Sequence, residues 1–458
     1  MSIGGRGDRT ARIYRQLRDA IVDGRLRDGD RLPATRDLAR QLEVSRNTVA
    51  AAYQRLTSEG FARTRTGAGT FVCATALPAV PRRVTAQSLR PRQLWTALPP
   101  AAMDRPRPRY DLRAGICDVS LFPFEAWRRL TSRALRPRNL HFGHYTEPAG
   151  NPGLRDAITR HIGVSRGVRA EPADVLVTQG AQQALDLIAR VLIEPGDPVA
   201  VEDPGYPPAR AAFTAAGARV VPVPVDDEGI VVDALPERVR LVYTTPSHQF
   251  PLGVVLSLRR RVQLLEWARQ HRAAVIEDDY DSEFRYSQRP LEPLHGLDSA
   301  GHVVYVGSFS KTLLPALRLG FLIAPEGLRT ALSAAKQVTD WHGETFTQAV
   351  LAEFIDEGLL GTHIRKASRV YGARHGELAR RVEGMRGLRL VESSAGLHVC
   401  ARAASGDTDV DAVVRLAGAR GVALRTLAGT HSGAEPPGLL IGFGAIAYEH
   451  IGSAMDIV

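Results

Sequence analysis

The chain has 458 residues, of which 44% are hydrophobic, and a formal net charge of +10 at pH 7. This length exceeds one ordinary hydrophobic core, so we expect two or more domains. The sequence has no apolar run of membrane-spanning length, no secretory leader and no metal-spaced or framework cysteines, so we expect a cytoplasmic protein without a membrane span, a disulfide framework or a metal site.

The positive charge is concentrated at the N-terminal end. Residues 1–109 carry a net charge of +12, whereas the rest of the chain carries −2. A basic end on a nearly neutral body is typical of a protein with a polyanion partner such as nucleic acid. An arginine-rich surface without a partner would give the same charge, so charge alone does not decide between the two interpretations.

Residues 1–73 have the pattern of a small DNA-binding domain. A first amphipathic helix is followed by two short helices, with Thr35 and Ser45 as N-caps, which meet near Val44 almost without a spacer. This is the helix-turn-helix layout. The segment "FARTRTGAGTFV" then alternates apolar and polar residues around glycines, which predicts a small β-hairpin.

The second helix of such a motif enters the major groove with its N-terminal turn. The hydrogen-bonding side chains of that turn and the cations of the hairpin are Ser45, Arg46, Asn47, Thr48, Arg63 and Arg65. Any one of them is better explained as a cap or a solvated surface group. The helices, the hairpin and the charge together favour DNA binding.

The segment "DGRLRDGDRLPATRDLARQLEVSRNTVAAAYQRLTSEGFARTRTGAGTFV" closely resembles the GntR-type winged helix-turn-helix. The resemblance covers roughly residues 10–73. It implies that the DNA contacts are made by Arg36, Ser45, Arg46, Asn47, Thr48 and the hairpin tip near Gly67. Some members carry a further DNA-contacting arginine where this chain has Ala50.

Residues 74–109 contain seven prolines and seven arginines, which predicts a semi-extended linker. From residue 110 to residue 458, short β-branched runs alternate with helical stretches, as in α/β domains. These runs are "DVLVTQG", "PVAVEDPG", "RVVPVPV", "RLVYTTPS", "AAVIEDDY" and "HVVYVGSFS". They predict a mostly parallel sheet that is buried on both faces and binds ligands at the carboxyl ends of its strands. From about residue 361 an α+β pattern predicts a smaller C-terminal subdomain.

Lysine is rare in this chain, which has 3 lysines and 56 arginines. Lys311 follows an apolar strand, whereas an isolated lysine is usually a surface charge. Arginine stays protonated, but a lysine amine can lose its proton and attack a carbonyl, so Lys311 is a candidate for a Schiff base. The aldehyde cofactor most often held in this way is pyridoxal phosphate.

Pyridoxal phosphate also needs a carboxylate at its ring nitrogen, a donor at its ring oxygen, an aromatic stack and a phosphate cradle. Asp278, Tyr280 and Tyr206 are the candidates for the first three, although Asp278 could instead be a cap or an ion-pair partner and Tyr206 a core aromatic. The candidate cradle consists of Gly180, Ala181, Gln182, Ser308, Ser310 and Arg318.

The motifs "YTEPAGNPGLRDAI", "VTQGAQQALDL", "VEDPGYP", "TPSHQFPLG", "VIEDDYDSEFRY" and "SFSKTLLPALRLGFLIAP" resemble fold-type I aminotransferases in the same order. Together with the GntR-type head, they resemble the MocR/GabR family of regulators over the whole chain. This resemblance implies that Lys311 is the Schiff-base lysine. It also implies a homodimer in which Tyr145 reaches the cofactor phosphate of the neighbouring subunit.

Two departures from the aminotransferase pattern concern the ligand. The chain has "FPLG" at Phe250 where the enzymes have "NPxG", so the asparagine expected at the ring oxygen is missing, and His248 or Gln249 is the candidate replacement. The segment "LLIGFGAI" lacks the arginine that clamps a substrate carboxylate. Arg425 and Arg210 are the candidates for that role.

These patterns predict a multidomain protein: a winged helix-turn-helix, a linker and an α/β fold-type I aminotransferase-like domain with a smaller α+β subdomain. The leading hypothesis is a nucleoid-associated transcriptional regulator that senses pyridoxal phosphate, an amino compound, or both, through an aldimine on Lys311. The first alternative is an active aminotransferase with an accessory DNA-binding head. The second is a DNA-binding protein whose large domain binds no cofactor.

Overall fold

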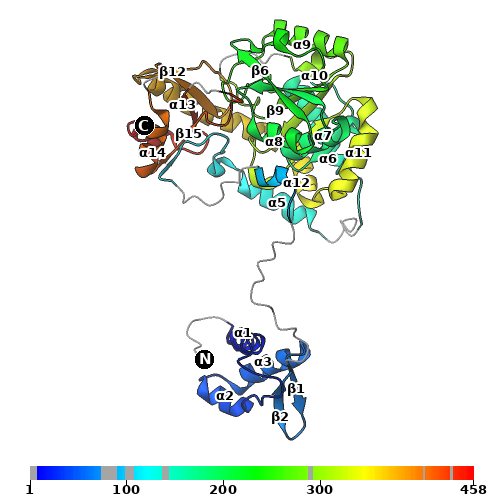
Figure 1. The fold of residues 1–458 in the computed structure, drawn as a ribbon, viewed down its shortest axis with the longest axis vertical. Coiled ribbons are helices and arrows are strands. Elements are labelled where there is room, and N and C mark those ends of the chain that lie inside the picture. The colour runs from blue at the N-terminus through cyan, green and yellow to red at the C-terminus, as the bar shows by residue number, and fades with distance from the viewer. Residues whose placement is uncertain are drawn as a thin grey trace. The chain divides into compact units, whose positions relative to one another are not determined.

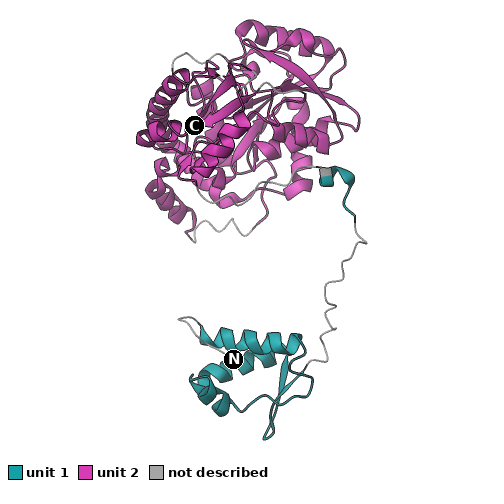
Figure 2. Ribbon diagram, turned by 60° about the vertical axis from the view of Figure 1, so that its left-hand side comes forward, with its two compact units in different colours: residues 1–96 teal, residues 97–458 magenta. Residues whose placement is uncertain are grey.

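The computed structural model describes residues 8–73, 90–97, 108–136, 144–286, 292–405, 408–433 and 437–458. The chain divides into two compact units, residues 1–96 and residues 97–458, which Figure 2 colours separately. Each unit has its own hydrophobic core. Most of the predicted linker lies outside the described residues, apart from a short helix, α4 (Gln93–Ala97). Among the described helices, none is long and apolar enough to cross a membrane.

The smaller unit is a helix-turn-helix with a β wing, as predicted (Figure 1). Its elements are α1 (Arg9–Val22), α2 (Thr35–Gln41), α3 (Arg46–Ser58), β1 (Ala62–Arg65) and β2 (Gly69–Val72). Apolar residues at helical spacing build its core, in which Ile13, Val49 and Leu56 are fully buried. At the tip of the wing, Gly67 has a φ of +77°, a left-handed conformation that favours glycine.

Of the two predicted N-caps, the structure confirms Ser45 and contradicts Thr35. Ser45 caps α3, because its side chain accepts a hydrogen bond from the backbone N–H of Thr48 at 3.1 Å. The prediction for Thr35 is wrong by one residue: Ala34 is the N-cap of α2, with extended backbone and no side-chain cap. Asp37 lies in the first turn of α2, where its negative charge interacts favourably with the positive end of the helix dipole.

The larger unit is built on an eight-stranded sheet with the order β4-β11-β10-β9-β8-β5-β6-β7. Its strands are β4 (Val175–Thr178), β5 (Pro198–Asp203), β6 (Arg219–Asp226), β7 (Gly229–Ile230), β8 (Leu241–Thr244), β9 (Ala274–Asp279), β10 (Val303–Ser308) and β11 (Gly320–Ile323). All six predicted strands are present. β11 and β7 were not predicted, and they pair antiparallel with their neighbours.

Helices cover both faces of this sheet, as predicted for a mostly parallel sheet (Figure 1). Leu176 of β4 packs in one core cluster, whereas its neighbours Val175 and Val177 pack in another, because alternate strand residues point to opposite faces. The first cluster includes residues of α7 (Ala181–Leu192), α8 (Pro207–Ala215) and α11 (Glu326–Asp340). Residues on the other face come from α5 (Phe124–Ala134), α6 (Pro152–Arg166), α9 (Leu258–His271), α10 (Leu294–Leu297) and α12 (Thr345–Asp356).

The C-terminal part has the predicted α+β character. A four-stranded sheet has the order β12-β13-β16-β15. Its elements and the helices beside it are α13 (Leu359–Glu383), β12 (Leu388–Leu390), β13 (His398–Ala403), α14 (Val410–Ala419), β15 (Arg425–Thr426), β16 (Gly438–Gly442) and α15 (Tyr448–Met455).

This C-terminal core also includes the beginning of the larger unit. β3 (Tyr110–Asp111) pairs with β14 (Val422–Ala423), and Leu112 and Cys117 pack in the same cluster as α13 and β13. The sequence prediction, which began the subdomain near residue 361, did not include this segment. Two-residue strands that pair across some 300 positions leave no periodic pattern to detect.

We expect Leu56→Ala to destabilise the smaller unit by about 2–5 kcal/mol, because truncation of a buried leucine removes packing contacts and leaves a cavity. Hydrogen–deuterium exchange of the α3 amides in the full chain measures this. Val22→Ala, at an exposed position of α1, is the control. Equal protection of α3 in the two variants would contradict the assignment of Leu56 to the core.

Candidate functional site

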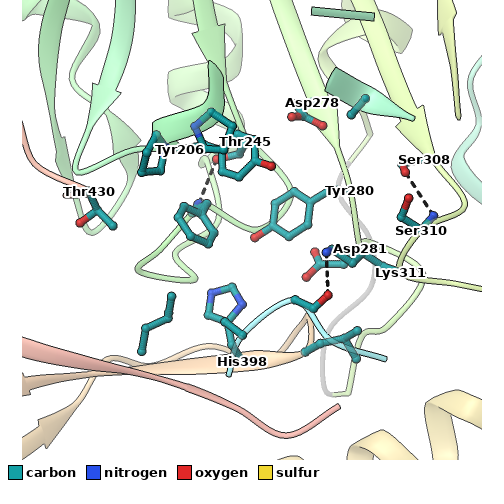
Figure 3. Close-up of a pocket in the computed structure, with 18 of the residues that line it drawn as sticks. Tyr206, Thr245, Asp278, Tyr280, Asp281, Ser308, Ser310, Lys311, His398 and Thr430 are labelled. Carbon is teal, nitrogen blue, oxygen red and sulfur yellow. Dashed lines mark hydrogen bonds between the residues drawn. The ribbon is translucent and has the colours of Figure 1, made fainter. Parts of the chain in front are cut away.

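A cavity of about 510 Å³ opens at the carboxyl edge of the large sheet. Residues at the ends of β8, β9 and β10 line it together with residues of the C-terminal sheet (Figure 3). The predicted site residues that line this cavity are Ala181, Gln182, Tyr206, Asp278, Tyr280, Ser308, Ser310, Lys311, Arg318 and Arg425.

Lys311 lies in the turn that follows β10, and its amine faces the cavity (Figure 3). Its Nζ donates a hydrogen bond to the carbonyl oxygen of Gly115 at 2.8 Å. A Cβ on Gly115 would lie 3.0 Å from that nitrogen, so glycine keeps the approach open. No salt bridge in the described part of the chain involves Lys311. The amine is therefore held by a neutral backbone group and is not committed to a carboxylate.

Three consecutive acidic residues end β9, and strand alternation separates them. Glu277 and Asp279 have cations close by: Arg261 Nη1 lies 3.7 Å from Glu277, and Arg166 Nη2 lies 2.8 Å from Asp279. Burial opposes ionisation of Asp279, but the charge of Arg166 lowers its pKa below the usual value. The middle residue, Asp278, lines the cavity instead.

Among the described residues, no cation pairs with Asp278. Its Oδ2 accepts a hydrogen bond from the hydroxyl of Tyr243 at 2.8 Å, and its Oδ1 is buried without any partner. Burial raises the pKa of Asp278 to about 7, and nearby carboxylates act in the same direction. Burial also raises the pKa of Tyr243 far above its usual value, so this hydroxyl remains a donor. A protonated ring nitrogen at Oδ1 would satisfy this carboxylate, which is the donor that pyridoxal phosphate supplies.

The candidate phosphate cradle lies where β4 turns into α7. Gly180, with a φ of +76°, is the N-cap of α7 and offers no side-chain cap, so backbone N–H groups at the start of α7 remain available to an anion. Arg318 donates to the carbonyl oxygen of Gln179 at 2.7 Å, and a Cβ on Gly180 would lie 3.2 Å from its guanidinium. The backbone N–H of Ser310 donates to Ser308 Oγ at 3.1 Å. These groups fit a phosphate.

The two predicted replacements for the missing asparagine do not line the cavity. The amide of Gln249 is buried and donates to the carbonyl oxygens of Pro204 and Phe250 at 2.8 and 2.7 Å, so it holds two loops together. His248 Nδ1 lies 3.1 Å from both carboxylate oxygens of Asp281. The prediction that either side chain takes the place of the asparagine is not supported, because neither lines the cavity, and the Gln249 amide and His248 Nδ1 are engaged behind its wall.

Tyr280 does line the cavity, and His248 holds its hydroxyl. Tyr280 Oη lies 2.9 Å from the His248 carbonyl oxygen and 3.0 Å from its Nδ1. The ring of His398 lines the cavity in front of His248, with 4.8 Å between the two ring centroids. Burial lowers the pKa of His398 well below its usual value, so this imidazole is neutral.

His248, Asp281 and His398 have ligand atoms within 4.8 Å of one another. Among the described residues, this is the group of histidine, cysteine and acidic side chains whose ligand atoms lie close enough together to hold a metal ion. Hydrogen bonds of His248 with Asp281 and Tyr280, and of His398 Nε2 with the carbonyl oxygen of Pro251 at 3.2 Å, account for most of the arrangement, although His248 Nε2 is buried without a partner. The absence of a metal site stays a prediction.

The two candidates for binding an effector carboxylate differ. Arg425, on β15, is exposed and lies at the cavity. Arg210 does not line the cavity, because its guanidinium donates to the carbonyl oxygens of Thr430 and His431 at 2.6 and 3.1 Å. The position of Arg425 is therefore compatible with the role and that of Arg210 is not.

Tyr145 also lies outside the cavity of its own chain. It is 79% exposed and packs against the ring of Trp341, with 5.0 Å between the centroids. This location leaves it free to contact another molecule.

In the smaller unit, the predicted DNA-contacting residues lie on or beside α3 and the wing. Arg36, Arg46, Asn47, Arg63 and Arg65 are exposed. Within the described residues, acidic side chains pair with Arg18, Arg25, Arg40 and Arg55 but with none of those predicted DNA-contacting arginines. Ser45 and Thr48 bond each other through their hydroxyls at 2.8 Å.

Sequence reasoning missed several cavity residues. Tyr243 could have been found, since β8 lies beside β9 and alternation points it to the same face as Asp278. Gly115 and His398 lie far from the predicted strand ends in sequence, and no local pattern indicated them.

We expect the contribution of Asp278 to lower the free energy of unfolding of the cofactor-free chain as the pH rises from about 4 to about 7, because the folded state keeps a proton on Asp278 that the unfolded state releases. In Asp278→Asn this contribution is absent, so the variant's free energy of unfolding should fall less steeply with pH. Urea unfolding at a series of pH values measures the slope. Asp227→Asn, at an exposed position, is the control. Parallel curves for wild type and Asp278→Asn would contradict the raised pKa.

Comparison with known proteins extends these observations. A family model for aminotransferase class I and II matches residues 110–428, and one for bacterial regulatory proteins of the gntR family matches residues 9–72. The probable rhizopine catabolism regulatory protein MocR of Rhizobium meliloti is 39% identical over 79% of this chain and 74% of its own length. The uncharacterized HTH-type transcriptional regulator YhdI of Bacillus subtilis is 34% identical over 96% of this chain and 92% of its own.

Among solved structures, the kynurenine aminotransferase of Pyrococcus horikoshii in complex with PMP is 28% identical. It covers 81% of this chain and 94% of its own, with a TM-score of 0.71. Aminotransferases of class I and II bind pyridoxal phosphate, and the cavity around Asp278 and Lys311 fits that cofactor. The chain therefore belongs to the MocR/GabR-type family of transcriptional regulators, in which a GntR-type DNA-binding domain precedes an aminotransferase-like domain.

Proposed function

We propose that this protein binds operator DNA as a cytoplasmic homodimer and that pyridoxal phosphate, an amino compound, or both, control this binding through Lys311. One observation carries the proposal. In a chain that also contains a helix-turn-helix, a lysine amine bound only to a backbone carbonyl and a buried carboxylate that pairs with no described cation face the same cavity. The amino-compound class follows from the cofactor, since its aldehyde condenses with primary amines.

The residues of the chain have separate roles in this proposal. Lys311 presents its amine to the aldehyde, and Asp278 holds the proton on the ring nitrogen. Tyr206, whose ring packs edge-on against Phe250, covers the ring of the cofactor. Arg318 and the N-terminal turn of α7 hold the phosphate. These groups orient the cofactor and satisfy its charges.

The effector site is proposed at the side of the cavity formed by the C-terminal sheet. Arg425 offers a cation for a carboxylate, and Leu397 and Leu440 add apolar surface. An effector with an amine and a carboxylate would reach from the aldehyde of the cofactor, beside Lys311, to Arg425, and so would contact both the large sheet and the C-terminal sheet. The strength of this contact would differ between two arrangements of the two sheets, so binding of the effector would favour one arrangement.

A homodimer is supported by the surface around Tyr145. Tyr145, Val338 and Trp341 are 79%, 89% and 49% exposed, a concentration of large apolar side chains that favours a protein partner. A dimer also suits DNA binding, because two heads contact two half-sites. We propose that Tyr145 contacts the cofactor site of the second subunit.

The aminotransferase-like fold supports a second candidate, transamination by this same site. Phe250 counts against efficient turnover, since its phenyl ring cannot donate a hydrogen bond where the enzymes have an asparagine. Sustained conversion of an amino donor and a keto acid by the purified protein would establish the enzyme. Binding of an amino compound without turnover would support the regulator.

We expect cofactor binding to change the affinity of the wild-type protein for its operator by about 5-fold or more, a typical coupling between two sites. In Lys311→Ala the affinities with and without cofactor should be the same. Fluorescence anisotropy with labelled operator measures all four states. Lys366→Ala, an exposed lysine on α13, is the control and should behave as the wild type. Identical affinities in the four states would exclude a switch through Lys311.

We expect Arg46→Ala to weaken operator binding by about 1–3 kcal/mol, because Arg46 lies in the N-terminal turn of α3 and pairs with no acidic side chain in the described part of the chain. Arg25→Ala removes the same charge from a residue that pairs with Asp23, so its effect should be smaller. Titrations at several salt concentrations separate phosphate contacts from base contacts, since loss of a phosphate contact lowers the salt dependence. Equal effects of the two variants would place the interface elsewhere.

A further inference from the structure

A second lysine, Lys336, has an environment that the proposed function does not explain. It lies on α11 outside the cavity and is fully buried. Its Nζ donates to both carboxylate oxygens of Asp340, at 2.7 and 2.9 Å, one helical turn further along. Together these two residues form what we call the α11 clasp.

Hydrogen bonds connect the α11 clasp to the turn between β4 and α7 and to the start of α7. Asp340 Oδ2 accepts hydrogen bonds from the amides of Gln183 and Gln179, at 2.8 and 3.2 Å. The side-chain oxygen of Gln183 in turn accepts the backbone N–H of Gln179 at 2.8 Å. Hydrogen bonds therefore fix both the side chain and the backbone of Gln179. The side chain is bonded to Asp340 directly and the backbone through Gln183, and Asp340 is in turn paired with Lys336.

Gln179 is also the residue that Arg318 contacts from the cavity side. The guanidinium of Arg318 donates to the Gln179 carbonyl oxygen at 2.7 Å, and the next residues along the chain are Gly180, Ala181 and Gln182. Ala181, Gln182 and Arg318 all line the cavity. The turn is thus bound on one side by the α11 clasp and on the other by the arginine of the candidate phosphate cradle.

Stability alone does not account for the clasp. Removing an ammonium and a carboxylate from water is costly, and well-packed apolar residues at such positions are often as stable or more stable. An ion pair does offer directed bonds of fixed length, which apolar packing does not. Asp340 can accept from Lys336 and from two glutamines together only as a carboxylate.

We propose that the Lys336–Asp340 pair is a positioning element for the phosphate cradle. It fixes Gln179, and through it the guanidinium of Arg318 and the N–H groups at the start of α7, in the geometry that receives a phosphate. It thereby sets the preference of the site for a phosphorylated over a non-phosphorylated pyridoxal. This inference rests on the proposed binding of pyridoxal phosphate.

The test compares pyridoxal phosphate with pyridoxal, which lacks the phosphate, as ligands of the full-length protein. We expect Lys336→Met to weaken binding of pyridoxal phosphate by about 10-fold or more, as loss of an outer partner of a binding site commonly does. Affinity for pyridoxal should be unchanged, because its aldehyde and ring contacts do not involve the clasp. Absorbance titration of the bound ligand measures both constants, and the exposed Lys366→Met is the matched control.

Asp340→Asn provides a second variant in case Lys336→Met does not fold. An asparagine is neutral and turns an NH2 group toward either the ammonium of Lys336 or the glutamine amides, all of which are donors. We therefore expect the same selective loss for the phosphorylated ligand. Equal losses for the two ligands, or no loss for either, would overturn the positioning role. Failure of the wild type to bind pyridoxal phosphate would instead overturn the proposed function.

Discussion

The alternation of side chains along β9 is the constraint on which the site depends. Because successive residues of a strand face opposite sides, three consecutive acidic residues are divided between two environments. Arg261 and Arg166 compensate Glu277 and Asp279 on one side. On the other side no cation among the described residues pairs with Asp278, whose Oδ1 is buried without a partner, and burial raises the pKa of this carboxyl to about 7. A ligand that donates a hydrogen bond to this oxygen therefore gains binding free energy, because the site excludes water.

The remaining walls of the cavity come from distant parts of the chain. The amine of Lys311 donates a hydrogen bond to the carbonyl oxygen of Gly115, which lies in a segment that packs with the C-terminal core. His398 and Arg425 come from the C-terminal sheet itself. A ligand in the cavity therefore contacts both sheets of the larger unit, as a ligand must if its binding is to change how these parts are arranged. The aminotransferase-like architecture thus suits a sensor as well as a catalyst.

The three lysines have three different environments in a chain that otherwise uses arginine. Lys311 faces the cavity, Lys336 is fully buried against Asp340, and Lys366 is exposed. The first position requires an amine that can lose its proton and attack a carbonyl, which a permanently charged guanidinium cannot do. At the second position the ammonium donates to both oxygens of one carboxylate in a fully buried site.

The sequence alone determined the two domains, all six predicted strands of the large sheet and the residues at their carboxyl ends, because helical period, strand alternation and glycine turns are local properties. It also indicated Lys311, Asp278 and Arg318 as site residues, and all three line one cavity. Only the tertiary structure showed that Gln249 and Arg210 are engaged elsewhere, and that Tyr243, Gly115 and His398 complete the wall. Whether a polar side chain is free depends on its hydrogen-bond partners, and these partners lie on elements that are far apart in sequence and adjacent only in the fold.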